Sequence, residues 1–432
     1  MIMKKILNIK NWIFIKYKLL YRLLLYFAIN TSCWKWKQKW LLSKVLSYSN
    51  NHCEYYSNLS IKAQNDIEQY PLLSKDLIKK NYNALISDEA KYIDYGVGYT
   101  GGSTGEPLKL LLCNRFDGFF QEKLWRQWGY VDGDIILAMD GTKFTEDDEC
   151  KGIVGKKISE TQLPYGGWCL SSIYLTNKNI TKYIDFINVV KPDVIRGYPS
   201  FIYSIAQYIL VNNITLDCTI KGVELTSESS YPYQHDVISK AFNCSVFLQY
   251  GHTEAIVFGY TFDSSMRYRV DPLYGYVEIL DNDGRPVAVG EVGEIVVTTL
   301  YNYVMPFIRY RTGDFAEYGG CDATGIILNR IMGRTQDYII DRAGNKKLLT
   351  ALIFAQHIKA FSNITKWQIE QFEPGKIILH IVPSKNYSDT DEEEIVNLFL
   401  QVGNTESQID YCNEIKITGR GKSLMCVQHI DD

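Results

Sequence analysis

Short apolar runs alternate with amphipathic stretches over residues 97–300. The runs have the length and the branched residues of buried strands, whereas the stretches between them have helical periodicity. The predicted strands include residues 108–113, 134–139, 194–198 and 245–250, and the predicted helices include 115–129, 177–190, 199–213 and 231–242. Alternation of this kind predicts an α/β fold with covered β-sheets.

The pattern changes on both sides of this region. Residues 10–90 are predicted to be mainly helical, and residues 274–300 predict a β-hairpin, with Asp283-Gly284 as its turn, and a following strand. After a boundary near 334–337 the pattern predicts a small α/β module. Its predicted strands lie around 338–341, 376–383 and 414–417, and its predicted helices around 350–361 and 391–402. We therefore divide the chain into a helical region (1–90), a main α/β domain (91–335) and a small C-terminal domain (336–432).

Charge is distributed unevenly along the 432 residues. There are 46 Lys and Arg against 49 Asp and Glu, a net charge of −3, which argues against a uniformly basic nucleic-acid-binding protein. Residues 1–44 contain ten Lys or Arg and no acidic residue. Their longest uncharged stretch has 12 residues, too few to span a bilayer. Two interpretations stay open: a helix that contacts an anionic membrane surface or a glycan-assembly partner, or a helix packed on the protein with a solvated basic face.

The ten cysteines are scattered and form no C-x-x-C pair. This spacing argues against a structural zinc site and against a dense disulfide framework. A reduced, cytoplasmic setting, with the option of peripheral attachment to the inner membrane face, is the simplest interpretation.

A segment rich in glycine and hydroxyl groups precedes the strand predicted at 108–113. It comprises Thr100, Gly101, Gly102, Ser103, Thr104 and Gly105. Glycine allows the backbone to approach a ligand closely, and successive N–H groups together with hydroxyls can surround phosphate oxygens. The segment lacks the Lys-Ser/Thr pair of a Walker motif. It therefore predicts either a phosphate-binding loop of another kind or an ordinary surface loop.

Four further motifs follow in order along the chain. They are Tyr250-Gly251-His252-Thr253-Glu254, Tyr310-Arg311-Thr312-Gly313-Asp314, Gly333-Arg334-Thr335-Gln336-Asp337 and Thr418-Gly419-Arg420-Gly421-Lys422. With the loop at 100–105, this ordered set resembles the adenylate-forming superfamily of acyl-CoA ligases, luciferase and peptide-synthetase adenylation domains. The closest resemblance is to phenylacetate–CoA ligases and their relatives encoded in capsular-polysaccharide loci, which share the Tyr55-Tyr56 pair and the Pro-Leu-Leu-Ser-Lys element at 71–75.

The resemblance implies a reaction and a set of roles. A carboxylate attacks the α-phosphate of ATP and gives an acyl-adenylate and pyrophosphate, so positioning and charge neutralisation are required. The Thr100–Gly105 loop would hold the β- and γ-phosphates, Thr253 would contact the α-phosphate and Glu254 would bind Mg²⁺. The resemblance further implies that Tyr250 stacks on adenine beside Gly251, that Asp314 binds the ribose hydroxyls, that Arg334 contacts ribose or phosphate, and that Lys422 bridges the substrate carboxylate and the α-phosphate.

The same resemblance extends to the adenine and acyl pockets and to the hinge. Ser227 and Glu228 match the strand end that lines the adenine pocket, and Gln336 occupies the interdomain hinge of a mobile C-terminal lid. Tyr165, Gly166, Gly167 and His252 are expected near the acyl pocket, although ordinary core packing explains them equally well.

The sequence departs from the family pattern in several places. Glu106 stands where many relatives have Lys, and residues 255–276 contain no Cys or His, so we expect no zinc. Residues 343–347 match the loop lining the thiol tunnel of CoA-dependent relatives only in part, which leaves CoA and an amine both open as acyl acceptors. The leading hypothesis is an ATP-dependent carboxylate ligase acting in surface polysaccharide biosynthesis. The alternatives are a phenylacetate–CoA ligase of aromatic catabolism, a nucleotidyltransferase that adenylates a hydroxyl, and an inactive scaffold.

Overall fold

The computed structural model describes residues 33–59, 61, 66–99, 108–113, 117–162, 164–262, 266–334, 338–349, 352, 360–418 and 421–430. The chain forms two compact units, each assembled from two separate stretches. Unit 1 comprises Met1–Phe120 and Tyr250–Ile331, and unit 2 comprises Gln121–Gln249 and Met332–Asp432. Local patterns cannot reveal such a division, because it depends on contacts between distant stretches.

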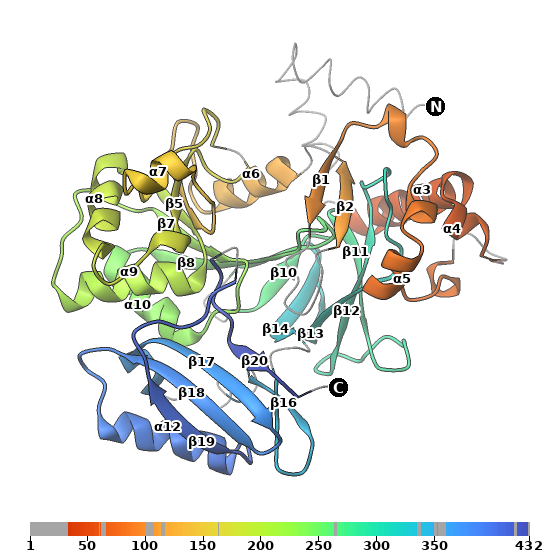
Figure 1. Ribbon diagram of the computed structural model, residues 1–432. Helices are drawn as coiled ribbons and strands as arrows, with labels where there is room; N and C mark the ends of the chain where they lie inside the picture. Colours follow the sequence, from red (N-terminus) through yellow and green to blue (C-terminus); the bar gives the residue numbers. More distant parts are fainter. Residues whose placement is uncertain are drawn as a thin grey trace. The chain divides into compact units, whose positions relative to one another are not determined.

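Unit 1 joins the helix α3 and several shorter helical elements to an antiparallel sheet (Figure 1). Its helical elements are α3 (Trp34–His52), α4 (Glu54–Ser57), η1 (Ile67–Gln69), α5 (Lys75–Lys80), η2 (Asn83–Leu85) and η3 (Ala90–Tyr92). A hairpin of β1 (Tyr95–Tyr99) and β2 (Lys109–Cys113) follows. The sheet runs in the order β11 (Gly275–Leu280), β12 (Val292–Thr299), β13 (Tyr310–Cys321), β14 (Ile326–Arg334), β10 (Tyr268–Val270) and β9 (Phe258–Thr261).

The turn predicted at Asp283-Gly284 is present in unit 1. The N–H of Gly284 donates to the carbonyl of Asp281 at 3.0 Å, and Gly284 has a φ of 79°, which glycine adopts at little cost. After this turn the chain pairs with β11 only through a single bridge between Leu280 and Pro286. The antiparallel partner of β11 along its whole length is the following strand, β12.

Unit 2 begins with parallel strands connected by helices, as the sequence predicts. Strands β3 (Ile136–Asp140), β5 (Trp168–Ser171), β6 (Val194–Gly197), β7 (Gly222–Thr226) and β8 (Ser245–Gly251) pair in parallel in the order β8-β7-β6-β3-β5. β4 (Gly155–Lys157) adds an antiparallel edge. The helical elements are α6 (Asp117–Gln127), which crosses the unit boundary, α7 (Glu146–Cys150), η4 (Ser172–Tyr174), α8 (Ile180–Val190), α9 (Pro199–Val211) and α10 (Pro232–Phe242). α9 and α10 both begin at a proline, whose fixed φ suits the first helical position.

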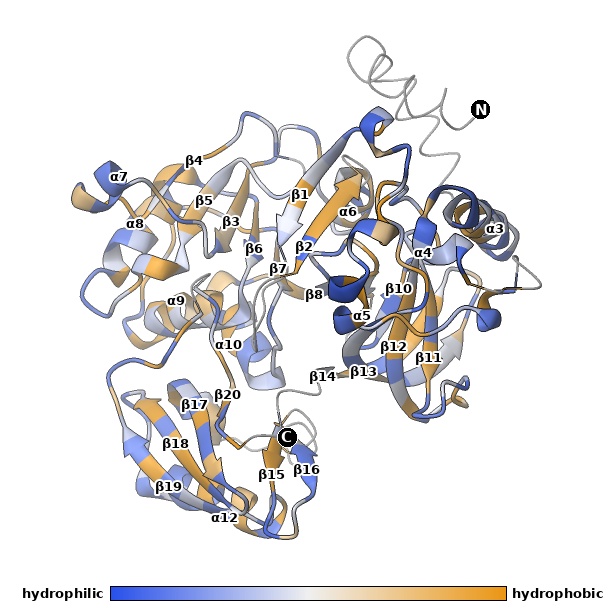
Figure 2. Cartoon of the chain, turned by 45° about the vertical axis from the view of Figure 1, so that its right-hand side comes forward, coloured by the Kyte–Doolittle hydropathy of each residue, from blue (hydrophilic) through white to orange (hydrophobic). Residues whose placement is uncertain are grey.

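The C-terminal part of unit 2 has its own four-stranded sheet. The order is β19 (Glu406–Tyr411), β18 (Lys376–Pro383), β17 (Ile364–Glu373) and β20 (Cys426–Gln428), preceded by the hairpin of β15 (Tyr338–Ile340) and β16 (Lys346–Leu348). Ile395, Leu398 and Phe399 of α12 (Asp389–Gln401) share one apolar core with β17 and β18, and the turn η5 (Ala360–Asn363) joins it. In Figure 2, β18 has orange, hydrophobic positions.

This domain differs from the sequence expectation in its strands. β17 and β19 were not expected, because polar residues interrupt both and β19 is largely exposed. The strand expected around 414–417 is a single bridge between Ile417 and Ser423. Most of the helix expected at 350–361 lies outside the described residues. Over the described ranges, no helix has both the length and the apolar character needed to cross a membrane.

Within unit 1, Tyr56 of the Tyr55-Tyr56 pair joins the helical region to the segment between β12 and β13. Its fully buried hydroxyl donates to the carbonyl of Pro306 at 2.9 Å and accepts from the N–H of Ile308 at 3.1 Å. Both backbone groups are buried, so each requires a partner.

We predict that Tyr56→Phe lowers the free energy of unfolding by about 1–3 kcal/mol, because two buried backbone groups lose their partner. Urea denaturation measures the change. Tyr55→Phe is the matched control, since Tyr55 is only partly buried, and it should change stability by less than about 0.5 kcal/mol. Equal losses in the two variants would contradict this account of Tyr56.

Candidate functional site

The Tyr250–Glu254 motif turns sharply as β8 ends at Gly251. The N–H of Ala255 donates to the carbonyl of His252 at 3.0 Å, and Ala255 has a φ of 52°. This turn exposes Gly251 and Thr253 but directs Glu254 inward, where it is only 4% exposed. The motif therefore presents a hydroxyl outward and buries a carboxylate.

The buried Glu254 finds its donor in the next motif. Tyr310, the fully buried first residue of β13, donates its hydroxyl to Glu254 Oε1 at 2.9 Å. His252 Nδ1 lies 3.8 Å from Glu254 Oε2. A buried carboxylate is costly unless donors or cations surround it, and these two side chains supply that environment.

Asp314 is held close by through the same histidine. Its Oδ2 accepts from the hydroxyl of Tyr250 at 2.8 Å and lies 2.9 Å from His252 Nε2. Gly313, with a φ of 77°, lies within β13 where its register with β12 is irregular, and the N–H of Asp314 donates to the hydroxyl of Thr312 at 3.1 Å. The structure thus brings together Tyr250, Glu254 and Asp314.

His252 lies between the two buried carboxylates, and its side chain is 5% exposed. Its expected place near an acyl pocket stays a prediction, whereas its contacts give it a bridging position within the motif cluster. Spacing alone could not show this bridge, because one of the two carboxylates, Asp314, comes from β13.

A second cluster, in unit 2, forms around Lys422. Thr418 accepts two hydrogen bonds there: the N–H of Gly421 donates to its carbonyl at 2.8 Å, and the N–H of Lys422 donates to its hydroxyl at 3.1 Å. Gly421 has a φ of 70°, and a Cβ there would lie 2.3 Å from the hydroxyl of Ser172. Glycine is therefore required by both conformation and space.

Lys422 contacts the strand end predicted to line the adenine pocket. Its ammonium donates to the carbonyl of Ser227 at 3.0 Å and lies 5.4 Å from the ring centroid of Tyr198. Glu228 accepts from the N–H of Ser423 at 2.8 Å and from the N–H of Ser200 at 3.1 Å. Burial raises the pKa of Glu228, although these bonds and Lys422 act in the opposite direction.

The Tyr165–Gly167 segment packs beside β3. Gly166 has a φ of 110°, and a Cβ at Gly167 would lie 2.6 Å from the amide nitrogen of Gln162. Tyr165 is 53% exposed, and the guanidinium of Arg196 lies 5.5 Å from its ring centroid. Close packing explains the glycines, so their expected role near a substrate stays a prediction.

Some predicted residues cannot be placed in a site. Thr100–Gly105 and Gln336 lie outside the described residues, although the strands that flank the loop are paired, with Tyr99 opposite Lys109. Arg334 is the last residue of β14. Their predicted roles stay predictions.

Sequence reasoning missed a buried polar network in unit 2. Glu224 lies at 0% exposure on the wholly buried strand β7, and its Oε2 accepts from the amide of Gln121 at 2.9 Å and from the indole of Trp125. Its Oε1 lies 3.5 Å from the guanidinium of Arg196. The sequence signal that could have indicated this network is Glu224 itself, a carboxylate inside the apolar run of β7.

Comparison with known proteins identifies a family model and several relatives that resemble this chain. Residues 343–429 match the family model described as the CapK C-terminal domain. The chain is 27% identical over 417 residues to protein CapK of Staphylococcus aureus, covering 89% of this chain and 87% of CapK. It is 22% identical over 333 residues to the phenylacetate-coenzyme A ligase of Escherichia coli, covering 74% and 73% of the two chains.

The solved structure of 2-hydroxyisobutyryl-CoA ligase, in the postadenylation state in complex with R3-HIB-AMP, has a TM-score of 0.69 to this chain. It is 15% identical, and the match covers 91% of this chain and 89% of that one. The predicted α/β fold, with a smaller C-terminal α/β domain, is therefore confirmed as the fold of adenylate-forming ligases. The predicted resemblance is confirmed as well, because the chain is homologous to CapK and to phenylacetate–CoA ligases.

We predict that Tyr310 and Glu254 are energetically coupled by about 1.5–3 kcal/mol, the range for a hydrogen bond to a charged group. A double-mutant cycle with Tyr310→Phe and Glu254→Gln, followed by urea denaturation, measures this coupling. The single variant Tyr310→Phe should destabilise the protein more than the same change made in the Glu254→Gln background. Strictly additive effects would show that the hydrogen bond does not stabilise the buried carboxylate.

Proposed function

We propose that this protein is an AMP-forming ligase that activates a carboxylic acid with ATP and then transfers the acyl group to CoA or an amine. The homology to CapK and to phenylacetate–CoA ligases supports the class of reaction. The observation that carries the proposal is the contact between Lys422 of the C-terminal domain and Ser227 at the end of β7, at 3.0 Å. Two segments that the family resemblance assigns to adenylation are in contact there.

Lys422 is the cation of the proposed adenylation step. A carboxylate and a triphosphate repel each other, so a fixed ammonium between them stabilises the charge that develops at the α-phosphate. The ammonium of Lys422 already faces a carbonyl oxygen and the ring of Tyr198, and these contacts fix its direction. In this proposal Tyr250 and Asp314 bind adenine and ribose, and the Thr100–Gly105 loop binds the outer phosphates.

Glu254 is the proposed ligand of Mg²⁺. Within the described part of the chain, no group of three or more His, Cys, Asp and Glu is arranged to hold a metal ion. A single carboxylate fits magnesium that arrives with the nucleotide, because this ion is usually held by one or two carboxylates together with substrate phosphates. Magnesium would neutralise phosphate charge, while Tyr310 holds the Glu254 carboxylate in place.

The acceptor and the biological setting are further parts of the proposal. We place the enzyme in surface polysaccharide biosynthesis because its sequence resembles the branch encoded in capsular-polysaccharide loci. An amine on a sugar and the thiol of CoA both accept an acyl group from an adenylate. A stable AMP adduct on a hydroxyl product, found by mass spectrometry, would instead favour nucleotidyl transfer.

We also propose that α3 contacts an anionic membrane surface. One face of this helix is buried within unit 1, and its buried residues include Trp34, Leu41 and Val45. The opposite face exposes Trp36 (69%) and Trp40 (46%) among Lys35, Lys39 and Lys44. Exposed tryptophan beside lysine is typical of a helix lying at a membrane interface, and α3 has no acidic residue to oppose such contact.

We predict that Lys422→Ala lowers ATP–pyrophosphate exchange about 100- to 1000-fold, the usual loss when one donor to a transition state is removed. Exchange would be measured over a panel of carboxylic acids that includes phenylacetate and 2-hydroxyisobutyrate. Lys385→Ala, at an exposed lysine of the same domain, is the matched control and should retain full exchange. Unchanged exchange in Lys422→Ala with any active acid would overturn the proposed role of this lysine. A parent protein that is inactive with every acid would overturn the ligase itself.

For α3, we predict that the double variant Lys35→Ala, Lys39→Ala binds phosphatidylglycerol-containing vesicles about 10- to 30-fold more weakly, since each basic residue at a membrane surface contributes about 1 kcal/mol. Co-sedimentation measures the binding, which should also fall as salt is raised. Val189→Ala, at another exposed apolar side chain, should bind like the parent. Equal binding to vesicles of phosphatidylcholine alone, or none to either, would rule out the anionic membrane and leave a protein partner for this face.

A further inference from the structure

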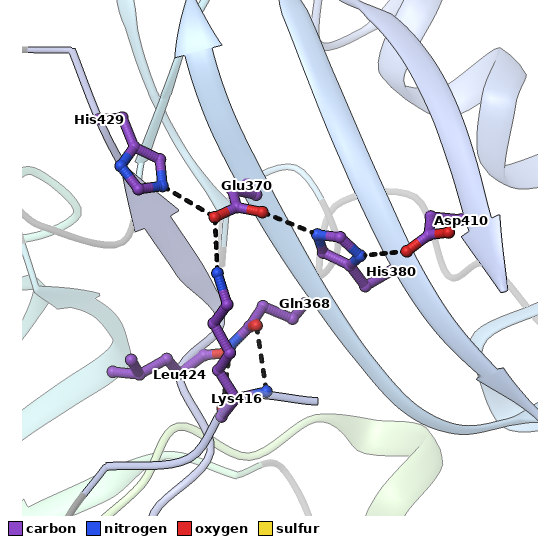
Figure 3. Close-up of polar contacts among 7 residues, drawn as sticks. All are labelled: Gln368, Glu370, His380, Asp410, Lys416, Leu424 and His429. Carbon is purple, nitrogen blue, oxygen red and sulfur yellow. Dashed lines mark hydrogen bonds and ion pairs between the residues drawn. The ribbon is translucent and has the colours of Figure 1, made fainter. Parts of the chain in front are cut away.

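One buried side chain closes the base of the loop that carries Lys422. Gln368 lies on β17 and is only 1% exposed. Its amide nitrogen donates to the carbonyl of Lys416 at 3.0 Å and to the carbonyl of Leu424 at 2.9 Å, and its oxygen accepts from the N–H of Lys416 at 3.3 Å (Figure 3). Both N–H groups of the amide are therefore used to hold residue 416 beside residue 424.

Glu370, two positions further along β17, holds the same stem from a second direction. Its Oε1 accepts from the ammonium of Lys416 at 2.8 Å and from His429 Nε2 at 2.8 Å. Its Oε2 lies 3.0 Å from His380 Nε2, and His380 Nδ1 in turn lies 2.7 Å from Asp410 Oδ2 (Figure 3). Burial opposes ionisation of Glu370, but these donors outweigh it and lower its pKa to about 2.

The stem and the tip of this loop are held by different parts of unit 2. Above Gln368, the bridge between Ile417 and Ser423 continues the pairing of the two arms. At the tip, the hydroxyl of Ser172 donates to the carbonyl of Gly421 at 3.0 Å, and Ser423 donates to Glu228. Gln368 and Glu370 make none of these tip contacts, so they act on Lys422 only through the stem.

We propose that Gln368, assisted by Glu370, is a positioning residue for Lys422 in adenylation. This inference rests on the proposed function, because it assigns a purpose to the hydrogen bonds of the stem only if Lys422 acts on the reacting groups. A buried amide that is fully hydrogen-bonded specifies one geometry, whereas an apolar residue would tolerate several. Misplacement of a reacting group by about 1 Å can lower a rate about 100-fold.

Gln371 offers a matched control on the same strand. It is also a buried amide, at 0% exposure, and it exchanges hydrogen bonds with Ile340 of β15, accepting from its N–H at 2.7 Å and donating to its carbonyl at 2.8 Å. Gln371→Leu therefore costs the domain a comparable set of bonds but leaves the 416–424 stem intact.

The experiment compares Gln368→Leu with Gln371→Leu in ATP–pyrophosphate exchange, using the acid that is most active with the parent protein. We expect Gln368→Leu to lower the maximal exchange rate about 10- to 100-fold with an unchanged apparent KM for ATP. Gln371→Leu should stay within about twofold of the parent once the folded fraction, measured by urea denaturation, is taken into account. In the Lys422→Ala background, Gln368→Leu should cause no further loss, because it acts through that lysine.

Hydrogen exchange provides a readout that needs no substrate. The amides of Thr418, Gly421 and Lys422 should exchange faster in Gln368→Leu and at the parental rate in Gln371→Leu. Lys416→Met removes the ammonium that reaches Glu370 at a side chain that is 64% exposed. Lys416→Met therefore tests the same stem if Gln368→Leu fails to fold, and we expect it to lower the maximal exchange rate as well.

The possible failures are distinguishable. If Lys422→Ala retains pyrophosphate exchange, the proposed role of Lys422 fails. If Lys422→Ala is inactive but Gln368→Leu and Gln371→Leu lose the same activity, or if Gln368→Leu lowers the residual rate of Lys422→Ala further, the positioning role of Gln368 is overturned while the proposed function stands. Parental exchange in both Gln368→Leu and Lys416→Met would overturn it as well.

Discussion

The need to surround buried carboxylates with donors organises the candidate site in unit 1. Glu254 and Asp314 are 4% and 5% exposed, and burying such charges is unfavourable unless hydrogen bonds or cations compensate. Tyr310 donates to Glu254, Tyr250 donates to Asp314, and His252 lies close to both carboxylates. Because each motif supplies a donor for the other motif's acid, neither segment reaches this arrangement alone. The geometry of this cluster is thus set by contacts among the protein's own side chains.

The C-terminal domain meets the same requirement differently. Glu370 on β17 collects donors from Lys416, His380 and His429, while Gln368 bonds the two ends of the loop that presents Lys422. The opposite face of the sheet packs on α12 through an ordinary apolar core. The two faces of β17 therefore have different roles. Its apolar face packs in the core of the domain, and its polar face bonds the stem of the loop that carries Lys422. Polar networks of this kind favour one conformation over many when every member is satisfied.

The sequence predicted much of this protein. Buried parallel strands have a strong local signal, so β3, β6 and β8 lie where their apolar runs predicted them. The turn at Asp283-Gly284 follows from the conformational freedom of glycine. β17 and β19 were missed because their polar residues obscure the pattern. The division into two units was beyond sequence reasoning, since each unit joins stretches far apart along the chain.

The sequence by itself therefore determined the buried parallel strands and the residue types of the motifs, because periodicity, turn chemistry and short motifs are local properties. It placed Ser227, Glu228 and Lys422 in motifs with related roles. Only the tertiary structure decided which groups meet. Lys422 contacts Ser227 across 195 residues, and Tyr310 reaches Glu254 across 56. Such pairings depend on which donor can be buried beside which acceptor, and that is settled only when distant strands and loops pack together.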